Sequence, residues 1–132
     1  MARVPILYDA DCGFCKWTLA VVLAWDRRRR LRPVALQAPE ADELLAGMER
    51  ERRFASWHLV EPGGRVRSAG AAVAPLMRLL PGGGPFGALA RSFPAVTNRA
   101  YRWVADHRSS FGKLTRPLVP RAERRIERRA RR

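Results

Sequence analysis

Residues 4–25 read VPILYDADCGFCKWTLAVVLAW, an apolar run, a short polar segment and a longer apolar run. Residues 4–8 have the length and composition of a buried strand. Residues 17–25 form an apolar run that is too long for a typical strand, so a helix is expected there. The pattern therefore predicts a strand, a tight turn and a helix that ends near residue 28. The only two cysteines of the chain lie in the turn and in the first turn of this helix.

These two cysteines, Cys12 and Cys15, are three residues apart and lie at the predicted N-terminus of this helix. Residues three apart share a helix face, so the two sulfurs are expected within disulfide reach. A cysteine at a helix N-terminus also faces unpaired backbone N–H groups and the positive end of the helix dipole. Both favour the thiolate, which is the reactive form of cysteine. A C-x-x-C pair between a strand and a helix therefore predicts a redox-active dithiol.

Three other interpretations of the pair are open from the residues alone. A structural zinc site needs four ligands, and neither His58 nor His107 pairs with a second histidine or cysteine at ligand spacing. A structural disulfide between Cys12 and Cys15 would close a loop too short to constrain the unfolded chain much. Two buried, inert thiols are the third possibility, because free cysteine is often buried.

The motif Asp9-x-x-Cys12-x-x-Cys15, preceded by an apolar strand ending in Tyr8, resembles the signature of the DCC family of thiol-disulfide oxidoreductases. The order of the following elements fits this family as far as about Leu114. The resemblance implies an α/β, thioredoxin-like fold: a four-stranded mixed sheet with flanking helices and extra C-terminal helices. It implies disulfide exchange with a protein or small-molecule disulfide or thiol, and no cofactor is expected.

The two sulfurs are assigned different roles. Cys12 lies nearest solvent and the helix end, so it is expected to attack as the thiolate, and Cys15 to resolve the mixed disulfide. Lys16 adds positive charge that favours a thiolate, whereas the carboxylates of Asp9 and Asp11 raise the pKa of a neighbouring thiol. Asp11 is expected to cap the helix. The family motif implies that Asp9 passes a proton to or from Cys15.

The rest of the chain predicts further strands and helices in an order that suits this fold. Strands are expected at 31–36, 54–60 and 65–68, and helices from Pro39, over 70–80, over 86–91 and over 95–108. In the last helix a core-facing stripe is expected, made of Val96, Ala100, Trp103, Val104 and His107. His58 is expected to face solvent or to be satisfied in the core. Thioredoxin-like sites usually carry a cis-proline before the third strand. No proline lies near Ala55-Ser56-Trp57, so the substrate-docking edge is expected to be built differently.

Composition divides the chain into two parts. The 132 residues include 26 basic and 12 acidic residues, a net charge of +14, and 47% are hydrophobic, which suits one globular domain. Residues 1–114 are expected to form that domain. Residues 115–132 are rich in arginine and are expected to be disordered or a frayed, solvated helix. Such a tail is expected to attach weakly to nucleic acid or anionic lipid.

Two further expectations follow from the sequence. No signal peptide precedes the first strand and the longest apolar run is too short to cross a bilayer, so a cytoplasmic protein with a cycling dithiol is expected. The rival hypothesis is a basic scaffold or adaptor that binds nucleic acid or an anionic membrane surface, with cysteines that are merely packed. The oligomeric state is open at this stage.

Overall fold

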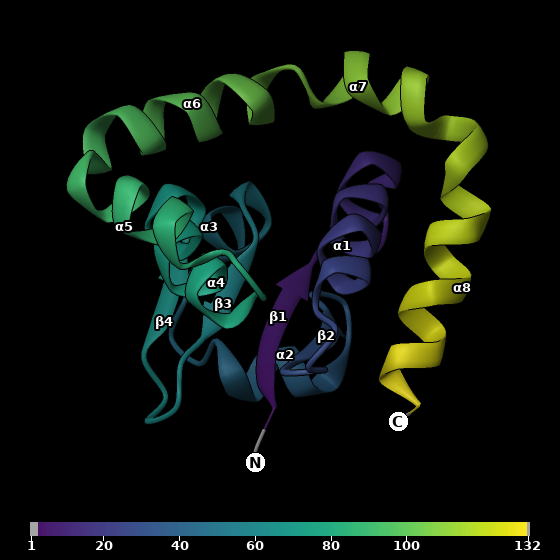
Figure 1. Ribbon diagram of the computed structural model, residues 1–132. Helices are drawn as coiled ribbons and strands as arrows, with labels where there is room; N and C mark the ends of the chain where they lie inside the picture. Colours follow the sequence, from purple (N-terminus) through teal and green to yellow (C-terminus); the bar gives the residue numbers. More distant parts are fainter. Residues whose placement is uncertain (1–2, 132) are drawn as a thin grey trace.

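The computed structural model describes residues 3–131 and contains one four-stranded mixed sheet with the strand order β2-β1-β3-β4 (Figure 1). The strands are β1 (Val4–Tyr8), β2 (Leu31–Ala35), β3 (His58–Val60) and β4 (Val66–Ser68). β1 pairs parallel with β2 and antiparallel with β3, and β3 pairs antiparallel with β4. This mixed sheet with flanking helices confirms the predicted α/β, thioredoxin-like architecture.

Helices make up most of the remaining chain. They are α1 (Gly13–Trp25), α2 (Pro39–Leu44), α3 (Arg50–Ala55), α4 (Val73–Leu79), α5 (Gly84–Ser92), α6 (Pro94–Asp106), α7 (Arg108–Thr115) and α8 (Val119–Ala130). Short 3₁₀ turns precede α4 and α8 at Ala69–Ala72 and Arg116–Leu118. Within residues 3–131, no helix is both long enough and apolar enough to span a bilayer.

The sheet separates two apolar clusters because side chains alternate between its faces along each strand. From β1, Val4 and Ile6 join a cluster with residues of α1, α4 and α8, whereas Leu7 joins a second cluster with Ala41 of α2. The first cluster also receives Leu19 and Leu23 of α1. These contacts hold α1 against the sheet and so fix where its N-terminus lies.

The predicted third strand, residues 54–60, was too long at its start. Residues 50–55 form α3, and the strand begins only at His58. Phe54 still packs against the second apolar cluster, but from a helix, so an apolar side chain that reaches the core was mistaken for part of a strand. His58 is fully buried, with Nδ1 2.6 Å from Ser68 Oγ and Nε2 2.8 Å from the Arg53 carbonyl oxygen. It is therefore satisfied in the core, one of the two predicted placements.

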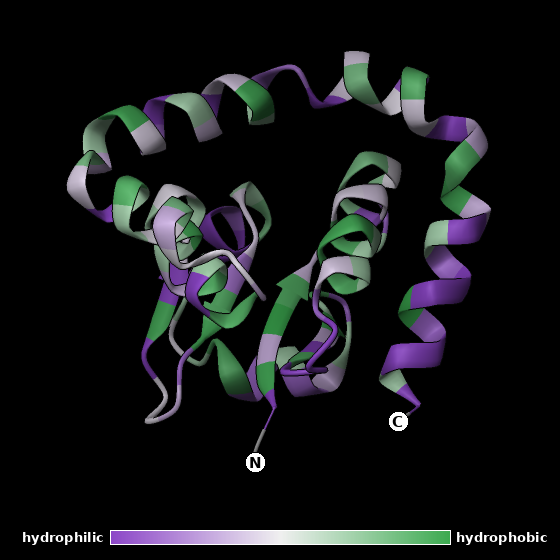
Figure 2. Ribbon diagram, in the orientation of Figure 1, coloured by the Kyte–Doolittle hydropathy of each residue, from purple (hydrophilic) through white to green (hydrophobic). Residues whose placement is uncertain are grey.

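Of the two alternatives predicted for the tail, disorder was wrong for residues 119–130, and a helix is present that is anchored on one face and not merely solvated. These residues form α8, which runs beside α1 (Figure 1). Most of α8 is hydrophilic (Figure 2), but Ala122 and Ile126 are buried, and Ile126 belongs to the main apolar cluster. The segment has too few apolar residues to form a core of its own. In the folded protein it adds two apolar side chains to the core of the domain.

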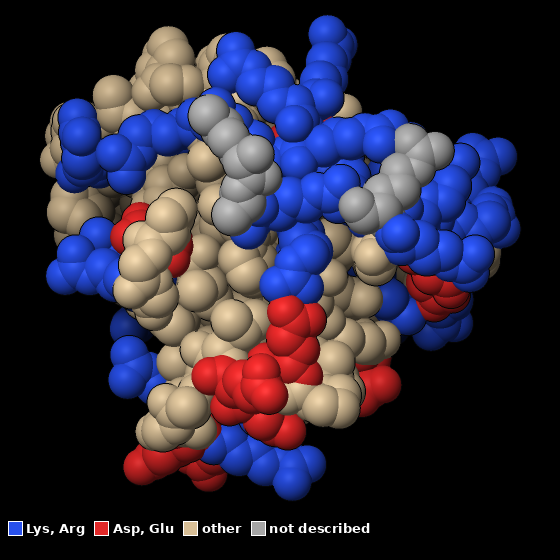
Figure 3. Space-filling view, turned by 90° about the horizontal axis from the view of Figure 1, so that it is seen from below, with Lys and Arg blue, Asp and Glu red and all other residues tan. Residues whose placement is uncertain are grey.

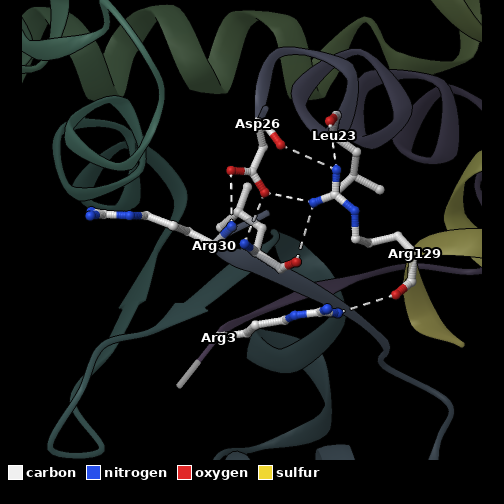
Figure 4. Close-up of polar contacts among 6 residues, drawn as sticks. Arg3, Leu23, Asp26, Arg30 and Arg129 are labelled. Atoms are coloured by element: carbon white, nitrogen blue, oxygen red, sulfur yellow. Dashed lines mark hydrogen bonds and ion pairs between the residues drawn. The ribbon is translucent and has the colours of Figure 1, made fainter. Parts of the chain in front are cut away.

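A buried ion pair joins α8 to the end of α1 (Figure 4). Asp26, which follows α1, is fully buried, and its carboxylate accepts hydrogen bonds from the backbone N–H groups of Arg30 at 3.1 Å and Leu31 at 2.9 Å. Arg129 Nη1 donates to the same carboxylate at 2.6 Å, and its Nη2 donates to the Leu23 carbonyl at 3.0 Å. These bonds compensate the cost of burying the charge and end α1 at Trp25, earlier than predicted.

The helices α5, α6 and α7 form an arch over the end of the sheet where β1 stops and α1 begins (Figure 1). The predicted core stripe of α6 was wrong, because Val96, Trp103 and Val104 are 65%, 55% and 37% exposed. α6 packs instead through Asn98, whose Cα lies 2.6 Å from the position of a Cβ built on Gly70. Helical spacing identified the apolar face of α6, but in the described part of the chain this face is not buried in the core, and its Trp103 instead packs against His107 and against Phe111 of α7.

Candidate active site

Cys12 and Cys15 lie where the C-terminal end of β1 meets the N-terminus of α1. Cys12 has an extended backbone and is the N-cap residue, and its Sγ accepts a hydrogen bond from the Cys15 backbone N–H at 3.2 Å. Both cysteines are free and half-buried. The two cysteines therefore lie beside each other, as the three-residue spacing predicts, and neither residue is fully buried.

The surroundings of the pair separate the acidities of the two thiols. The pKa of Cys12 is lowered from 9.0 to about 6, mainly by the hydrogen bond from the Cys15 thiol and further by the Cys15 backbone N–H and the positive charge of Arg108. Burial and the negative charge of Asp9 act against this shift. The pKa of Cys15 is strongly raised, first by its hydrogen bond to Cys12, then by burial and by the charge on Cys12. The first proton therefore leaves Cys12, and a thiolate is present near neutral pH.

Arg108, the first residue of α7, brings a positive charge to the two sulfurs. Its guanidinium acts to lower the pKa of both Cys12 and Cys15, and its Nε donates to the Ala105 carbonyl at 3.1 Å. Arg108 was missed from the sequence, because it lies far along the chain from the C-x-x-C motif. It was expected that Lys16 would supply this charge, but Lys16 Nζ pairs with Glu123 Oε1 of α8 at 2.6 Å. Lys16 therefore contributes to the contact between α1 and α8.

Tyr101 of α6 covers the backbone just before β3. Its hydroxyl accepts a hydrogen bond from the Trp57 backbone N–H at 3.2 Å, and the two rings stack with centroids 6.3 Å apart. Burial raises the pKa of Tyr101 to about 12, and the charges of the cysteines contribute to this rise. Tyr101 therefore stays a neutral phenol beside the pair. The backbone before β3, where thioredoxin-like sites usually carry a cis-proline, is therefore covered in this protein by Tyr101 of α6.

Aromatic side chains cover one side of the motif. The ring of Phe14, between the two cysteines, stacks on Phe111 of α7 at 5.3 Å and on Trp17 at 6.1 Å. Trp103 meets Phe111 edge-on at 6.0 Å and stacks on the exposed ring of His107 at 4.5 Å. The arch thus places Phe111 against Phe14 on one side of the motif, and His107 is held by Trp103, away from the core.

A polar network fastens the turn that precedes the cysteines. Asp9 Oδ1 accepts hydrogen bonds from the Asp11 backbone N–H and from Gln37 Nε2, both at 2.9 Å. Gln37 Oε1 accepts from the Ala10 N–H at 3.1 Å, and Gln37 Nε2 also donates to Asp11 Oδ2 at 3.2 Å. Gln37 was missed, although it follows β2, whose C-terminal end lies beside that of its parallel neighbour β1.

The structure corrects the prediction for Asp11, whereas the proton-transfer role predicted for Asp9 stays a prediction. Asp11 was expected to cap α1, but Cys12 Sγ occupies that position, because the cysteine itself precedes the first helical residue. Asp9 lies close enough to raise the pKa of Cys12, and within residues 3–131 its carboxylate hydrogen-bonds to Asp11 and Gln37. The described residues contain no group of three or more His, Cys, Asp or Glu side chains placed to hold a metal ion.

Comparison with known proteins gives one match. The family model described as DCC1-like thiol-disulfide oxidoreductase matches residues 6–114 of the 132. No curated protein and no solved structure matches the chain. The matched segment includes both cysteines, Tyr101 and Arg108, and it ends before α8.

Proposed function

The chain belongs to the DCC1-like thiol-disulfide oxidoreductase family, and on that premise we propose that it exchanges disulfides through Cys12 and Cys15. The observation that carries this proposal is the Cys12 sulfur at the N-terminus of α1. It is half-buried, its pKa is lowered to about 6, and it is hydrogen-bonded to the thiol that would resolve it. The substrate class is a protein or small-molecule disulfide, or a dithiol in the reverse direction.

In the first step the Cys12 thiolate attacks one sulfur of a substrate disulfide. A bond forms between Cys12 and that sulfur, the substrate S–S bond breaks, and the second substrate sulfur leaves as a thiolate that takes a proton from water. Cys15 then loses its proton and attacks Cys12 Sγ, which releases the first substrate sulfur as a thiolate. The protein now holds a Cys12–Cys15 disulfide, and two electrons have passed to the substrate.

The same geometry explains why the two steps occur in order. While Cys12 is a thiolate, its hydrogen bond and its charge hold the proton on Cys15. Once Cys12 enters a mixed disulfide, that charge is gone, so two of the three causes of the raised Cys15 pKa weaken and burial alone is unchanged. Arg108 still faces Cys15 and stabilises the thiolate that must form. In this proposal Asp9, whose charge reaches Cys12, accepts or returns a proton during exchange.

The test is thiol trapping followed by mass spectrometry on the reduced and oxidised protein. The two forms should differ by two protons, and the difference should be confined to Cys12 and Cys15. With a disulfide substrate, Cys15→Ser should accumulate the mixed disulfide, because nothing resolves it, whereas Cys12→Ser should not. Equal yields from the two variants would contradict the assigned roles. Circular dichroism of both variants controls for folding.

A further inference from the structure

A shallow groove of about 470 Å³ lies between α1 and α8, and its floor is apolar. α1 contributes Trp17, Ala20, Val21 and Ala24, whose spacing of three and four residues puts them on one helix face. Val21 is 49% exposed, and Leu118 at the start of α8 is 40% exposed. The floor therefore presents apolar surface to solvent over about two helical turns.

The rim of this α1–α8 groove is built of arginines. Arg121, Arg124, Arg125 and Arg128 line it, again at intervals of three and four residues, so they form one stripe along α8. A neighbouring face of α8 is anchored in the core by Ile126 and by the ion pair of Arg129 with Asp26. The stripe is thus held in place by the fold. In the described part of the chain, none of the residues that line the groove is acidic.

The molecule also carries a wider basic surface. Figure 3 shows Lys and Arg side chains over much of the face seen from below, with one cluster of acidic side chains near its centre and others among the basic side chains. Of the acidic residues in α8, Glu123 is paired with Lys16. The electrostatic field at the groove therefore favours an anionic partner.

We propose that the α1–α8 groove binds an acidic amphipathic helix of a partner protein. An apolar stripe on such a helix covers the floor while its carboxylates meet the arginine stripe, a mode of recognition in which a helix lies in a groove. A bilayer satisfies only part of this surface, because the apolar face of α8 is already buried and is not free to insert. A nucleic-acid backbone satisfies the arginines but leaves the apolar floor uncovered.

The groove begins about one and a half helical turns from the cysteine pair along α1. Trp17 follows Cys12 by five residues, which corresponds to about 8 Å along the helix axis and a rotation of about 140° around it. A partner helix in the groove therefore extends along α1 toward the end that carries the cysteines, and we infer that the partner is the protein whose disulfide or dithiol is exchanged. This second step rests on the proposed function, whereas the binding itself does not.

The probe is a synthetic peptide of about four helical turns, with leucine at positions i, i+3, i+4 and i+7 and glutamate elsewhere. Its binding to the full chain is measured by fluorescence anisotropy against a scrambled peptide of the same composition. We expect the amphipathic peptide to bind at least about tenfold more tightly, because only it pairs both surfaces. Equal affinity would show that net charge alone attracts the peptide and would overturn the proposal.

Three variants locate the binding site. The double variant Arg124→Glu, Arg125→Glu should lose roughly tenfold or more in affinity, because it reverses the rim. The matched variant Arg99→Glu, Arg102→Glu changes net charge equally on exposed residues of α6 and should retain most binding. Val21→Arg adds positive charge but obstructs the floor, so it should weaken binding. Equal losses from the two double variants, or tighter binding by Val21→Arg, would contradict docking in the groove. Circular dichroism verifies that each variant is folded.

Two further measurements decide the occupant and separate this inference from the redox proposal. Vesicles of phosphatidylglycerol and phosphatidylcholine, and a single-stranded RNA, are tested against the same variants. If the vesicles or the RNA bind more tightly than the peptide, and reversal of Arg124 and Arg125 abolishes that binding, lipid or nucleic acid would replace the acidic helix as the proposed occupant. The double variant Cys12→Ser, Cys15→Ser should bind the peptide as the parent does. A parent chain that binds the peptide but exchanges no disulfide would point to a failure of the redox proposal alone.

Discussion

The two ends of α1 each carry an anionic group that faces an arginine from the C-terminal helices. At the N-terminal end, the positive charge of Arg108 of α7 helps to lower the pKa of Cys12. At the C-terminal end, the carboxylate of Asp26 pairs with Arg129 of α8 at 2.6 Å. Both arginines lie far along the chain from α1. One stabilises a thiolate that stays reactive, whereas the other holds a carboxylate in the core.

The difference lies in burial and in the number of partners. Asp26 is fully buried, and two backbone N–H groups and a guanidinium saturate its carboxylate. The Cys12 sulfur is half-buried and accepts one backbone N–H and one thiol. A fully paired buried anion holds a structure together, whereas a stabilised but accessible anion is free to attack.

The largest expected effect comes from breaking the structural end. Arg129→Met removes the partner of a carboxylate that stays buried, so the free energy of unfolding should fall by about 3 to 5 kcal/mol. Urea denaturation measures this loss. Arg128→Met, on the exposed side of the same helix, should change it by less than about 0.5 kcal/mol. Similar losses from both variants would mean that the ion pair of Arg129 with Asp26 contributes no more to the free energy of unfolding than an exposed arginine does.

Breaking the reactive end should change acidity rather than stability. Cys15→Ala removes the hydrogen bond that is the main cause of the lowered Cys12 pKa, so this pKa should rise from about 6 toward 9.0. Because the thiolate is the reactive form, the alkylation rate at pH 7 should fall and its midpoint should move to higher pH. Cys15→Ser keeps a hydroxyl donor and should show a smaller rise. A midpoint that stays near pH 6 in Cys15→Ala would assign the shift to the helix end instead.

A smaller effect is expected from Arg108→Gln, which removes the positive charge from the reactive end. The pKa of Cys12 should rise, but less than in Cys15→Ala, because the charge of Arg108 contributes less than the hydrogen bond of Cys15. The alkylation profile is the readout, with Lys113→Gln in the same helix as a control that should leave the midpoint unchanged. A larger shift from Arg108→Gln than from Cys15→Ala would reverse this ranking.

The smallest effect is expected from Lys16→Met, although Lys16 is adjacent to Cys15 in sequence. Its ammonium pairs with Glu123, which is 47% exposed, and an ion pair of this kind contributes at most about 1 kcal/mol. Thermal unfolding should register a slight loss, and the midpoint of Cys12 alkylation should not move. A clear rise of that midpoint would restore to Lys16 the role that the sequence suggested.

Much of the sheet was predictable because its signals are local. The apolar run of β1 and the β3–β4 hairpin follow from patterns over a few residues. The errors arise where burial depends on a distant partner. The apolar stripe of α6 is exposed at Trp103 and Val104, and the arginine-rich segment is anchored at Ile126. Hydrophobic spacing shows which face a helix offers for packing, but it does not show whether another element covers that face.

The candidate site divides in the same way. The C-x-x-C spacing by itself determined that Cys12 lies at the start of a helix with Cys15 one turn further on, because helical geometry over three residues depends only on neighbouring backbone. Only the tertiary structure decided that Arg108 and Tyr101 lie beside these sulfurs and that Gln37 fastens the preceding turn. Those contacts depend on how distant helices and strand ends pack, and the hydrophobic effect that drives such packing is not directional and assigns no residue its partner.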